Sequence, residues 1–245
     1  MKIAEKDLKL FAYTNRALLR EAPRGIVLQF IGLGGNTRMI TEDPEEAKLF
    51  AARSILFVIP YIQPWAWMNR ASVSLTDAVV ACLIEAMSLP EDIPLISTGG
   101  SMGGQCALAY ACHAAKTPTA VAANCPVCDL PYHYTERADL PRTLYAAFGD
   151  YGMPLEDAMK TASPIHLAEK MPDVPYFIVH CEEDRSVNKE KHSDRLVKLL
   201  MKDHDVRYCE VPGRGHCDLS PEAKELWYGF IFSACEKKTP SEDGV

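Results

Sequence analysis

The chain has 245 residues, of which 48% are hydrophobic and 24% charged, and its formal net charge is −7. This length and apolar content suffice for one buried core, so we expect a single domain over residues 1–245. The acidic balance and the lack of a basic run exclude nucleic acid as an expected partner. The charged N-terminus has neither the apolar core of a signal peptide nor a membrane span, so a cytoplasmic protein is expected.

Nine cysteines are present, and their spacing is not that of a disulfide scaffold in a small secreted domain. Cys125 and Cys128 have a C-x-x-C spacing, but no second pair completes a structural zinc site. His133 could supply a third ligand, and no fourth stands nearby. The sequence therefore favours reduced, structural cysteines and predicts no metal and no cofactor.

The first part of the chain alternates apolar runs with amphipathic segments. Leu8 to Tyr13 alternates polar and apolar residues, which predicts an outer, antiparallel strand. The following segments predict buried strands at 25–31 and 55–60 and helices at 41–52 and 74–88. Strands that alternate with helices favour a mostly parallel sheet covered by helices on both faces.

A loop at residues 61–68 is rich in aromatic residues and broken by prolines. Tyr61, Trp65 and Trp67 are its most prominent side chains. They either pack beneath the loop as a satellite core or line a substrate pocket, and the sequence does not separate the two.

The chemistry of the sequence concentrates between Pro94 and Gln105. A short apolar run ends in Gly99-Gly100-Ser101-Met102-Gly103, a Gly-x-Ser-x-Gly turn, and a small-residue helix follows from 102 to about 113. A strand that turns directly into a helix holds the serine in a strained conformation with its hydroxyl exposed. We therefore interpret Ser101 as a nucleophile.

The second part of the chain resumes the alternation after an interruption. We expect strands at 119–124, 176–180 and 206–211, helices at 189–202 and 220–235, and a frayed tail at 236–245. Residues 129–170 predict two or three short helices without a strand. An insertion of that length at the carboxyl edge of the sheet would form a small helical cap above the site.

A serine nucleophile needs a base and a carboxylate that orients the base. Of seven histidines, His216 follows the last predicted strand in a turn freed by two glycines, where its ring could reach Ser101. The remaining six lie on helices, in the predicted cap or inside a strand, so structural roles are expected for them. Asp184, after the preceding strand, is the best acid, with Glu182, Glu183 and Asp129 as rivals.

The glycine cluster after the first buried strand could suggest a dinucleotide loop. That pattern requires glycine at position 37, which holds Thr37, so the dinucleotide interpretation fails. A glycine-rich turn here can instead present a backbone N–H to the neighbouring strand end. Leu33 is the expected donor, together with Met102 at the start of the helix after the nucleophile.

Together these pieces resemble the α/β-hydrolase superfamily and, within it, the catalytic domains of the prolyl oligopeptidase and dienelactone hydrolase-like esterase groups. The resemblance covers nearly the whole chain and is carried by residues 30–36, 99–104, 163–165, 180–187 and 213–216. Ile31 stands where relatives commonly have histidine, and Cys181 where they commonly have glycine.

The resemblance implies an acyl-enzyme mechanism: Ser101 attacks, His216 takes its proton, and the Leu33 and Met102 amides receive the oxyanion. The leading hypothesis is hydrolysis of small or medium acyl esters. A prolyl oligopeptidase-type peptidase is the first alternative. Such peptidases use a propeller to select short peptides, and we expect the catalytic domain to fill this chain and to leave no room for one. The second is a ligand-binding protein that has lost turnover.

Two solution properties follow from these roles. Activity should fall below about pH 6.5, the ordinary pKa of histidine, because the base must be neutral. Cys217, next to His216, should make the site sensitive to bulky thiol reagents. The sequence leaves open which acyl and alcohol groups are preferred and whether the chain forms a homodimer.

Overall fold

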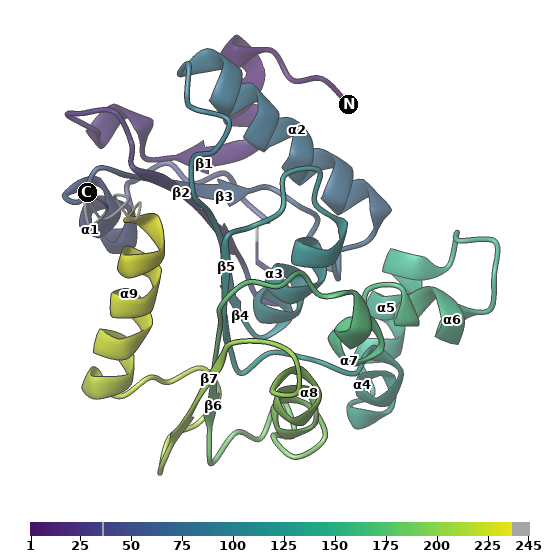
Figure 1. Ribbon diagram of the computed structural model, residues 1–245. Coiled ribbons are helices and arrows are strands. Elements are labelled where there is room, and N and C mark those ends of the chain that lie inside the picture. The colour runs from purple at the N-terminus through teal and green to yellow at the C-terminus, as the bar shows by residue number, and fades with distance from the viewer. Residues whose placement is uncertain (36, 237–245) are drawn as a thin grey trace.

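The structure, a computed structural model, describes residues 1–35 and 37–236, and its centre is a seven-stranded sheet (Figure 1). The spatial order is β1-β3-β2-β4-β5-β6-β7. The first strand runs antiparallel to β3, and the other neighbours are parallel. The strands are β1 (Ala12–Thr14), β2 (Gly25–Phe30), β3 (Ile55–Pro60), β4 (Leu95–Gly100), β5 (Ala120–Asn124), β6 (Tyr176–Cys181) and β7 (Val206–Val211).

Helices cover both faces of this sheet, which confirms the predicted fold class. On one face lie α1 (Glu45–Ala51) and α9 (Pro221–Cys235), and on the other lie α2 (Arg70–Ala86), α3 (Met102–His113) and α8 (Ser193–Leu200) (Figure 1). The buried side chains form one apolar cluster on each face. Because both faces are covered, the central strands are apolar throughout rather than alternating.

Register brings the carboxyl ends of the central strands to one rim. Phe30 of β2 pairs with Gly99 of β4, and Gly100 pairs with Asn124 of β5. Asn124 in turn pairs with Val179 near the end of β6. Residues that follow neighbouring strands at this rim are therefore close in space. Of the predicted catalytic residues, Ser101 follows β4, Asp184 follows β6 and His216 follows β7.

Short helices occupy the segment between β5 and β6. They are α4 (Leu130–Glu136), α5 (Leu140–Phe148), α6 (Leu155–Lys160), α7 (Pro164–Leu167) and the 3-10 helix η3 (Ala168–Lys170), and they gather beside α3 and α8 (Figure 1). This fully described segment has more helices than the two or three predicted and contains no strand. Proline lies in the first turn of α4, α5 and α7 and at the N-cap of α6, which limits the length of the helix that precedes each one.

The N-terminal prediction was partly wrong. Residues 5–10 form the 3-10 helix η1 (Glu5–Leu10), and the antiparallel edge strand is only Ala12–Thr14, followed by the 3-10 helix η2 (Arg16–Leu18). In η1 only Leu8 is buried, and two acidic residues occupy the first turn, where the helix dipole favours them. Alternation of single apolar residues over six positions fits either structure.

Two further expectations concern the second half of the chain. The helix predicted from 189 begins only at Ser193, because the Asn188 side chain accepts from the Lys191 amide in a turn before it. Of the predicted tail, only Glu236 is described, and residues 237–245 lie outside the described residues.

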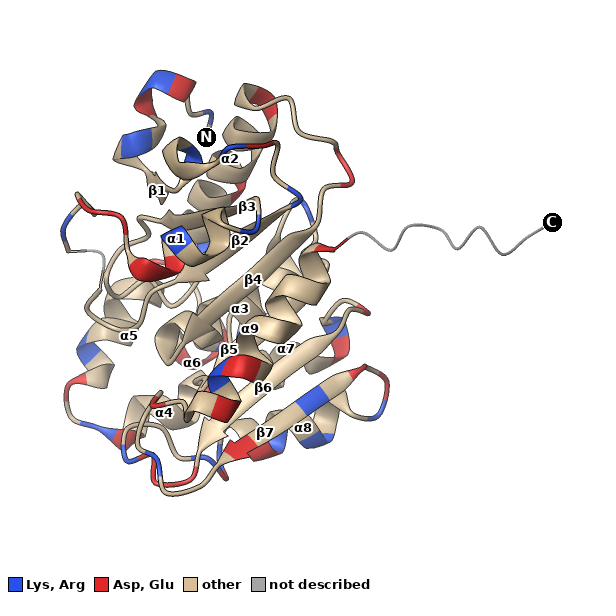
Figure 2. Cartoon of the chain, turned by 90° about the vertical axis from the view of Figure 1, so that its left-hand side faces the viewer, with Lys and Arg blue, Asp and Glu red and all other residues tan. Residues whose placement is uncertain are grey.

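Charged residues lie at the periphery of the sheet. Strands β4, β5 and β6 carry none, while acidic and basic residues are interspersed on the surrounding helices and loops (Figure 2). Within the described part of the chain, no helix has both the length and the apolar character needed to cross a bilayer.

Close packing of α3 on the sheet yields a stability prediction. A Cβ at Gly103 would lie 2.1 Å from the backbone oxygen of Phe30, whereas a Cβ at Gly229 in α9 meets nothing within 4 Å. We expect Gly103→Ala to destabilise the protein by about 1–3 kcal/mol or more. Gly229→Ala should stabilise it by roughly 0.5–1 kcal/mol, because alanine favours the helix. Denaturant unfolding of both variants tests the packing, and equal stabilities would contradict it.

Candidate active site

The nucleophile candidate stands at a strained turn between β4 and α3. Ser101 has φ 59° and ψ −125°, a backbone conformation that costs on the order of 1–3 kcal/mol for a residue with a side chain. Its amide donates to the Asn124 carbonyl at 2.9 Å, and its own carbonyl accepts from Gln105 at 3.1 Å. The turn predicted from the sequence is therefore present, with the serine half-buried at its apex.

Asp184 and His216 meet at the same rim. The His216 Nδ1–H donates to Asp184 Oδ2 at 2.6 Å, and the carboxylate is fully buried while the imidazole is 26% exposed. This contact fixes the tautomer of the neutral ring, because a carboxylate can only accept, and so Nε2 keeps its lone pair. An oriented imidazole with a free lone pair is the form that a general base requires.

A dense set of donors holds the Asp184 carboxylate. Its Oδ1 accepts from the amides of Ser186 at 2.8 Å and Val187 at 3.0 Å, and the buried His180 lies 3.3 Å from Oδ2. Burial by itself raises the pKa of Asp184, but the hydrogen bonds from His180, His216 and the two amides lower it well below its usual range. Asp184 is therefore ionised at every pH at which the enzyme would work.

The rivals for the acid role have other partners. Glu182 and Glu183 are exposed, and Glu182 accepts from the Gly213 amide. Asp129 caps α4 through the Tyr132 amide and pairs with Arg195 at 2.7 Å. Asp184 is the carboxylate that contacts His216 among these four candidates.

The Asp184 charge raises the pKa of His216, the expected base. Burial lowers the pKa of His216, but the hydrogen bonds to Asp184 and Cys125 outweigh it and raise the pKa to about 9. The hydrogen bond with Cys217 and burial raise the pKa of Cys125 itself, so this thiol keeps its proton at neutral pH. The charge that acts on His216 near neutrality is thus that of Asp184.

Asn124 joins the two halves of the site. It accepts from the Ser101 amide with its carbonyl, and its side-chain amide donates to the Cys217 carbonyl at 3.3 Å. Among the described residues, no hydrogen bond joins the Ser101 hydroxyl to His216, whose Nε2 lies 3.7 Å from Cys217 Sγ instead. Catalytic hydrogen bonds are often formed only when substrate binds, so a missing contact between Ser101 and His216 does not exclude Ser101 as the candidate nucleophile.

One expected oxyanion donor directly follows the serine, and the loop that contains the other passes close to it. Met102 is the first residue of α3, so its amide has no acceptor inside the helix. A Cβ at Gly32, the residue before Leu33, would lie 3.8 Å from Ser101 Cβ, which places this loop beside the nucleophile. Gly35 and Gly34 donate their amides to Gly32 and Pro64, which fixes the loop. Asn36 lies outside the described residues.

The aromatic residues of the loop after β3 divide between packing and exposure. Trp67 is 1% exposed, and its Nε1–H donates to Thr143 in α5. This burial favours the packing alternative for Trp67, because Thr143 of α5 and His133 of α4 contact the ring. Tyr61 and Trp65 are half-buried; Tyr61 accepts from the Ile40 amide, and Arg142 lies over the Trp65 ring.

Three supporting residues were missed or undervalued by the sequence analysis. Asn124 occupies the last position of a buried strand, Gln105 is fully buried and ties α3 to the Trp67 and Ala162 carbonyls, and His180 supports Asp184. A polar residue in an otherwise apolar segment is the signal that could have marked them. Their partners come from distant segments, which spacing does not reveal.

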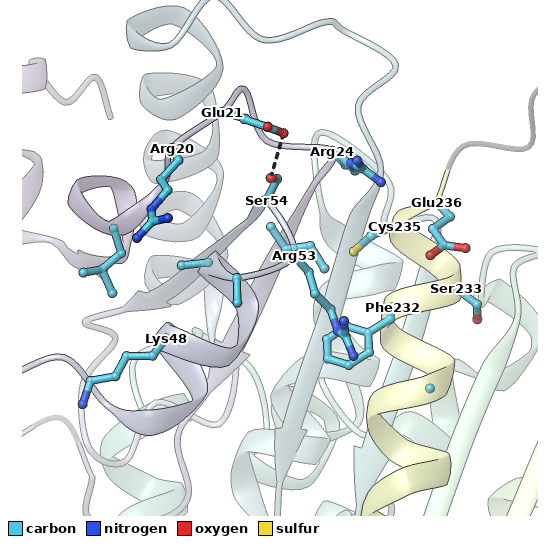
Figure 3. A pocket seen from close by; sticks show the side chains of 15 residues that line it. Arg20, Glu21, Arg24, Lys48, Arg53, Ser54, Phe232, Ser233, Cys235 and Glu236 are labelled. Atoms are coloured by element: carbon cyan, nitrogen blue, oxygen red, sulfur yellow. Dashed lines mark hydrogen bonds between the residues drawn. The ribbon is translucent and has the colours of Figure 1, made fainter.

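A hollow of about 990 Å³ lies away from this site (Figure 3). It is lined by Arg20, Arg24, Arg53 and the end of α9, at the amino ends of β2 and β3. Ser101 lies beyond the carboxyl end of β4, which runs parallel to β2. The hollow is therefore not part of the catalytic rim.

A profile of the prolyl oligopeptidase family matches residues 78–238, about two thirds of the chain. The chain belongs to the prolyl oligopeptidase family. It is thus a serine hydrolase with the α/β-hydrolase fold. Comparison with curated protein sequences gives no significant match.

Solved structures of similar fold include both esterases and peptidases. Esterase B from Lactobacillus rhamnosis superposes with a TM-score of 0.70 at 16% identity, over 89% of this chain and 78% of that one. The acylaminoacyl peptidase of Pyrococcus horikoshii gives 0.71 at 13% identity, over 93% and 39%. A puromycin-hydrolysing peptidase of Mycobacterium tuberculosis gives 0.66 at 22% identity, over 80% and 31%. This chain thus spans about a third of the two peptidases.

The raised pKa of His216 revises the expected pH dependence of this prolyl oligopeptidase relative. The neutral, active imidazole is lost as pH falls through the folded-state pKa, so the acid limb of kcat/KM should have its midpoint between pH 6.5 and about 9. Asp184→Asn should move that midpoint down and lower kcat by about 10⁴-fold. A pH–rate profile of both proteins checks this, and a wild-type midpoint below 6.5 would contradict the Asp184 contact.

Proposed function

We propose that the protein hydrolyses carboxylic esters through an acyl-enzyme on Ser101, with His216 as the base and Asp184 as the residue that orients it. The observation that carries the proposal is the buried Asp184 paired with His216 at 2.6 Å, at the same rim as the strained Ser101 turn. Neither feature stabilises the fold by itself: one stores backbone strain, and the other buries a charge. Their coincidence supports a catalytic role.

The reaction runs in two halves. The Ser101 hydroxyl attacks the acyl carbon while His216 Nε2 accepts its proton, and the amides of Met102 and Leu33 stabilise the oxyanion. The imidazolium gives the proton to the leaving alkoxide, and the alcohol departs. Water then attacks the acyl-enzyme with His216 again as base, which releases the acid and frees Ser101.

An apolar hollow next to the serine supports an acyl group as the bound part. It measures about 470 Å³, lies between the sheet, α1 and α9, and is lined in part by Gly100, Asn124 and Cys217. Its wall is mostly aliphatic and aromatic and includes Leu219 and Trp227. A hollow of this kind suits a small or medium acyl chain and offers few partners to a peptide backbone.

Peptide hydrolysis is the second candidate, and one observation favours it. Two of the structural neighbours are peptidases, and their matching parts cover 93% and 80% of this chain. An amide requires protonation of a poorer leaving group than an ester does. A bound ligand without turnover is the third candidate, and the complete set of Ser101, His216 and Asp184 argues against it.

Covalent labelling separates an enzyme from a binding protein. A fluorophosphonate probe should label the wild type, and Ser101→Ala should abolish the labelling and lower ester kcat by about 10⁶-fold. Thr98→Ser, a conservative change in the same strand away from the turn, serves as the control and should still be labelled. A wild-type chain that folds but resists the probe would favour the binding protein.

Acyl preference tests the apolar hollow. Filling the hollow with Leu219→Trp should reduce kcat/KM for hexanoate esters by about 10–200-fold relative to acetate esters, because the longer chain loses its apolar contacts. Matched p-nitrophenyl esters and p-nitroanilides of the same acyl groups give the comparison. If the anilide is hydrolysed faster than the matched ester, the protein is a peptidase rather than an esterase. If Leu219→Trp lowers kcat/KM equally for both esters, the acyl group binds outside this hollow.

A further inference from the structure

Two thiols and the catalytic imidazole form a compact cluster beside Ser101. The ligand atoms of Cys125, His216 and Cys217 all lie within 4.8 Å of one another. Cys217 Sγ is 3.7 Å from His216 Nε2, the nitrogen that carries the free lone pair. Two sulfurs and an imidazole nitrogen are the ligands that Zn²⁺ and similar borderline-soft ions prefer.

The surroundings of this cluster suit a bound metal. His216 donates its other ring N–H to Asp184, which is the carboxylate–histidine arrangement found behind histidine ligands of metals. The amides of Cys181 and Cys217 both donate to Cys125 Sγ, at 3.3 and 3.4 Å. Such donors stabilise the thiolate that remains once a bound ion has displaced the proton that Cys125 otherwise keeps.

In two other clusters of ligand atoms, hydrogen bonds already occupy both ring nitrogens of a histidine. In the group Cys125, His180 and Asp184, His180 Nε2 donates to the Val187 carbonyl at 3.2 Å, and Nδ1 accepts from Ser193 at 2.6 Å. The ring is therefore fully occupied on both sides.

The third cluster joins His133, Glu136 and His192 in the helical insertion. His192 Nδ1 accepts from the amides of Cys128 and Asp129 at 3.0 and 3.1 Å, so its Nε2 carries the proton and donates to Glu136 at 2.9 Å. A metal there would have to displace that proton and break a hydrogen bond that links α4 to the segment before α8.

We propose that Cys125, His216 and Cys217 form a binding site for Zn²⁺ or a similar thiophilic divalent cation, and that binding there reversibly inhibits the enzyme. The inhibitory part rests on the proposed function, because the ion takes the His216 lone pair that would receive the Ser101 proton. The two thiols release their protons to the buffer, as does the imidazole when it is protonated. No electron is transferred, and a tetrahedral ion has one position left for water.

The ion has a path to this site. Cys125 is fully buried, but His216 and Cys217 are half-buried, and Cys217 is part of the lining of the apolar hollow. The cluster is also separate from the C-x-x-C pair weighed in the sequence. Cys128 Sγ lies 3.4 Å from the Pro126 carbonyl and belongs to none of the three ligand clusters in the described chain.

Cobalt binding tests the site without any need for turnover. Co²⁺ added to the reduced full chain should produce a thiolate-to-cobalt charge-transfer band that saturates at one ion per chain. Loss of an outer partner of a metal ligand weakens binding by about 10–100-fold, so Cys125→Ser or Cys217→Ser should weaken it by about 100-fold or more. Cys209→Ser, which changes a half-buried thiol of β7, should bind as the wild type does.

Inhibition is measured on the same proteins. Zn²⁺ should slow fluorophosphonate labelling of wild-type Ser101 at least about tenfold, and a chelator should restore it. The two cysteine variants should be labelled in Zn²⁺ at nearly their metal-free rate. A wild type without the cobalt band, or a band that survives both substitutions, overturns the site. A full cobalt band together with labelling that Zn²⁺ does not slow overturns the inhibition. A normal cobalt band in a protein that is not labelled even without metal rejects the proposed function and leaves the metal site standing.

Discussion

The positive φ of Ser101 is the constraint on which the rest of the site depends. Strand β4 can pass into α3 at a single residue only because the helix lies directly against the backbone of β2. A Cβ at Gly99 would fall 2.4 Å from the Gly103 backbone, so this contact tolerates no side chain. A turn of this kind exposes the side chain at its apex and leaves the first amide of α3 without an acceptor inside the helix.

The remaining groups are held by hydrogen bonds rather than by apolar packing. Asp184 is buried as an anion, which is tolerable because two amides and two histidines donate to it. Asn124 links the nucleophile turn to the loop that carries His216. Residues Cys125 and Cys217 share with Ser101 a positive φ, at 44° and 58°. Three of the seven non-glycine residues with positive φ in the described chain thus lie at this rim, and such conformations are common at functional sites.

Much of this arrangement could be predicted from the sequence because its signals are local. Three signals are local in this sense: the apolar strand runs, the glycines around Ser101 and the turn before His216. Each of them is contained within a few consecutive residues. Topology then brings the strand ends together, so Asp184 could be matched to His216 without coordinates. The weak alternation before Tyr13 was compatible with both a strand and a 3-10 helix.

What could not be predicted depends on contacts between distant segments. Trp67 is a core residue because α5 covers it, and no pattern near position 67 records that helix. The high pKa of His216 comes from the geometry of its pair with Asp184, and the thiol cluster combines residues separated by about ninety positions. The acyl preference that we propose likewise depends on a hollow between the sheet, α1 and α9, which are distant in the sequence.

The central claim is that Ser101 becomes covalently acylated, and trapping that intermediate tests it most directly. An ester with a slowly hydrolysed acyl group, quenched in acid within the first turnover, should raise the intact mass of the chain by one acyl unit. Peptide mass spectrometry should place the group on Ser101, and Asp184→Asn should reduce its rate of formation. An adduct on Cys217 or on another residue, or turnover without any adduct, would contradict the account.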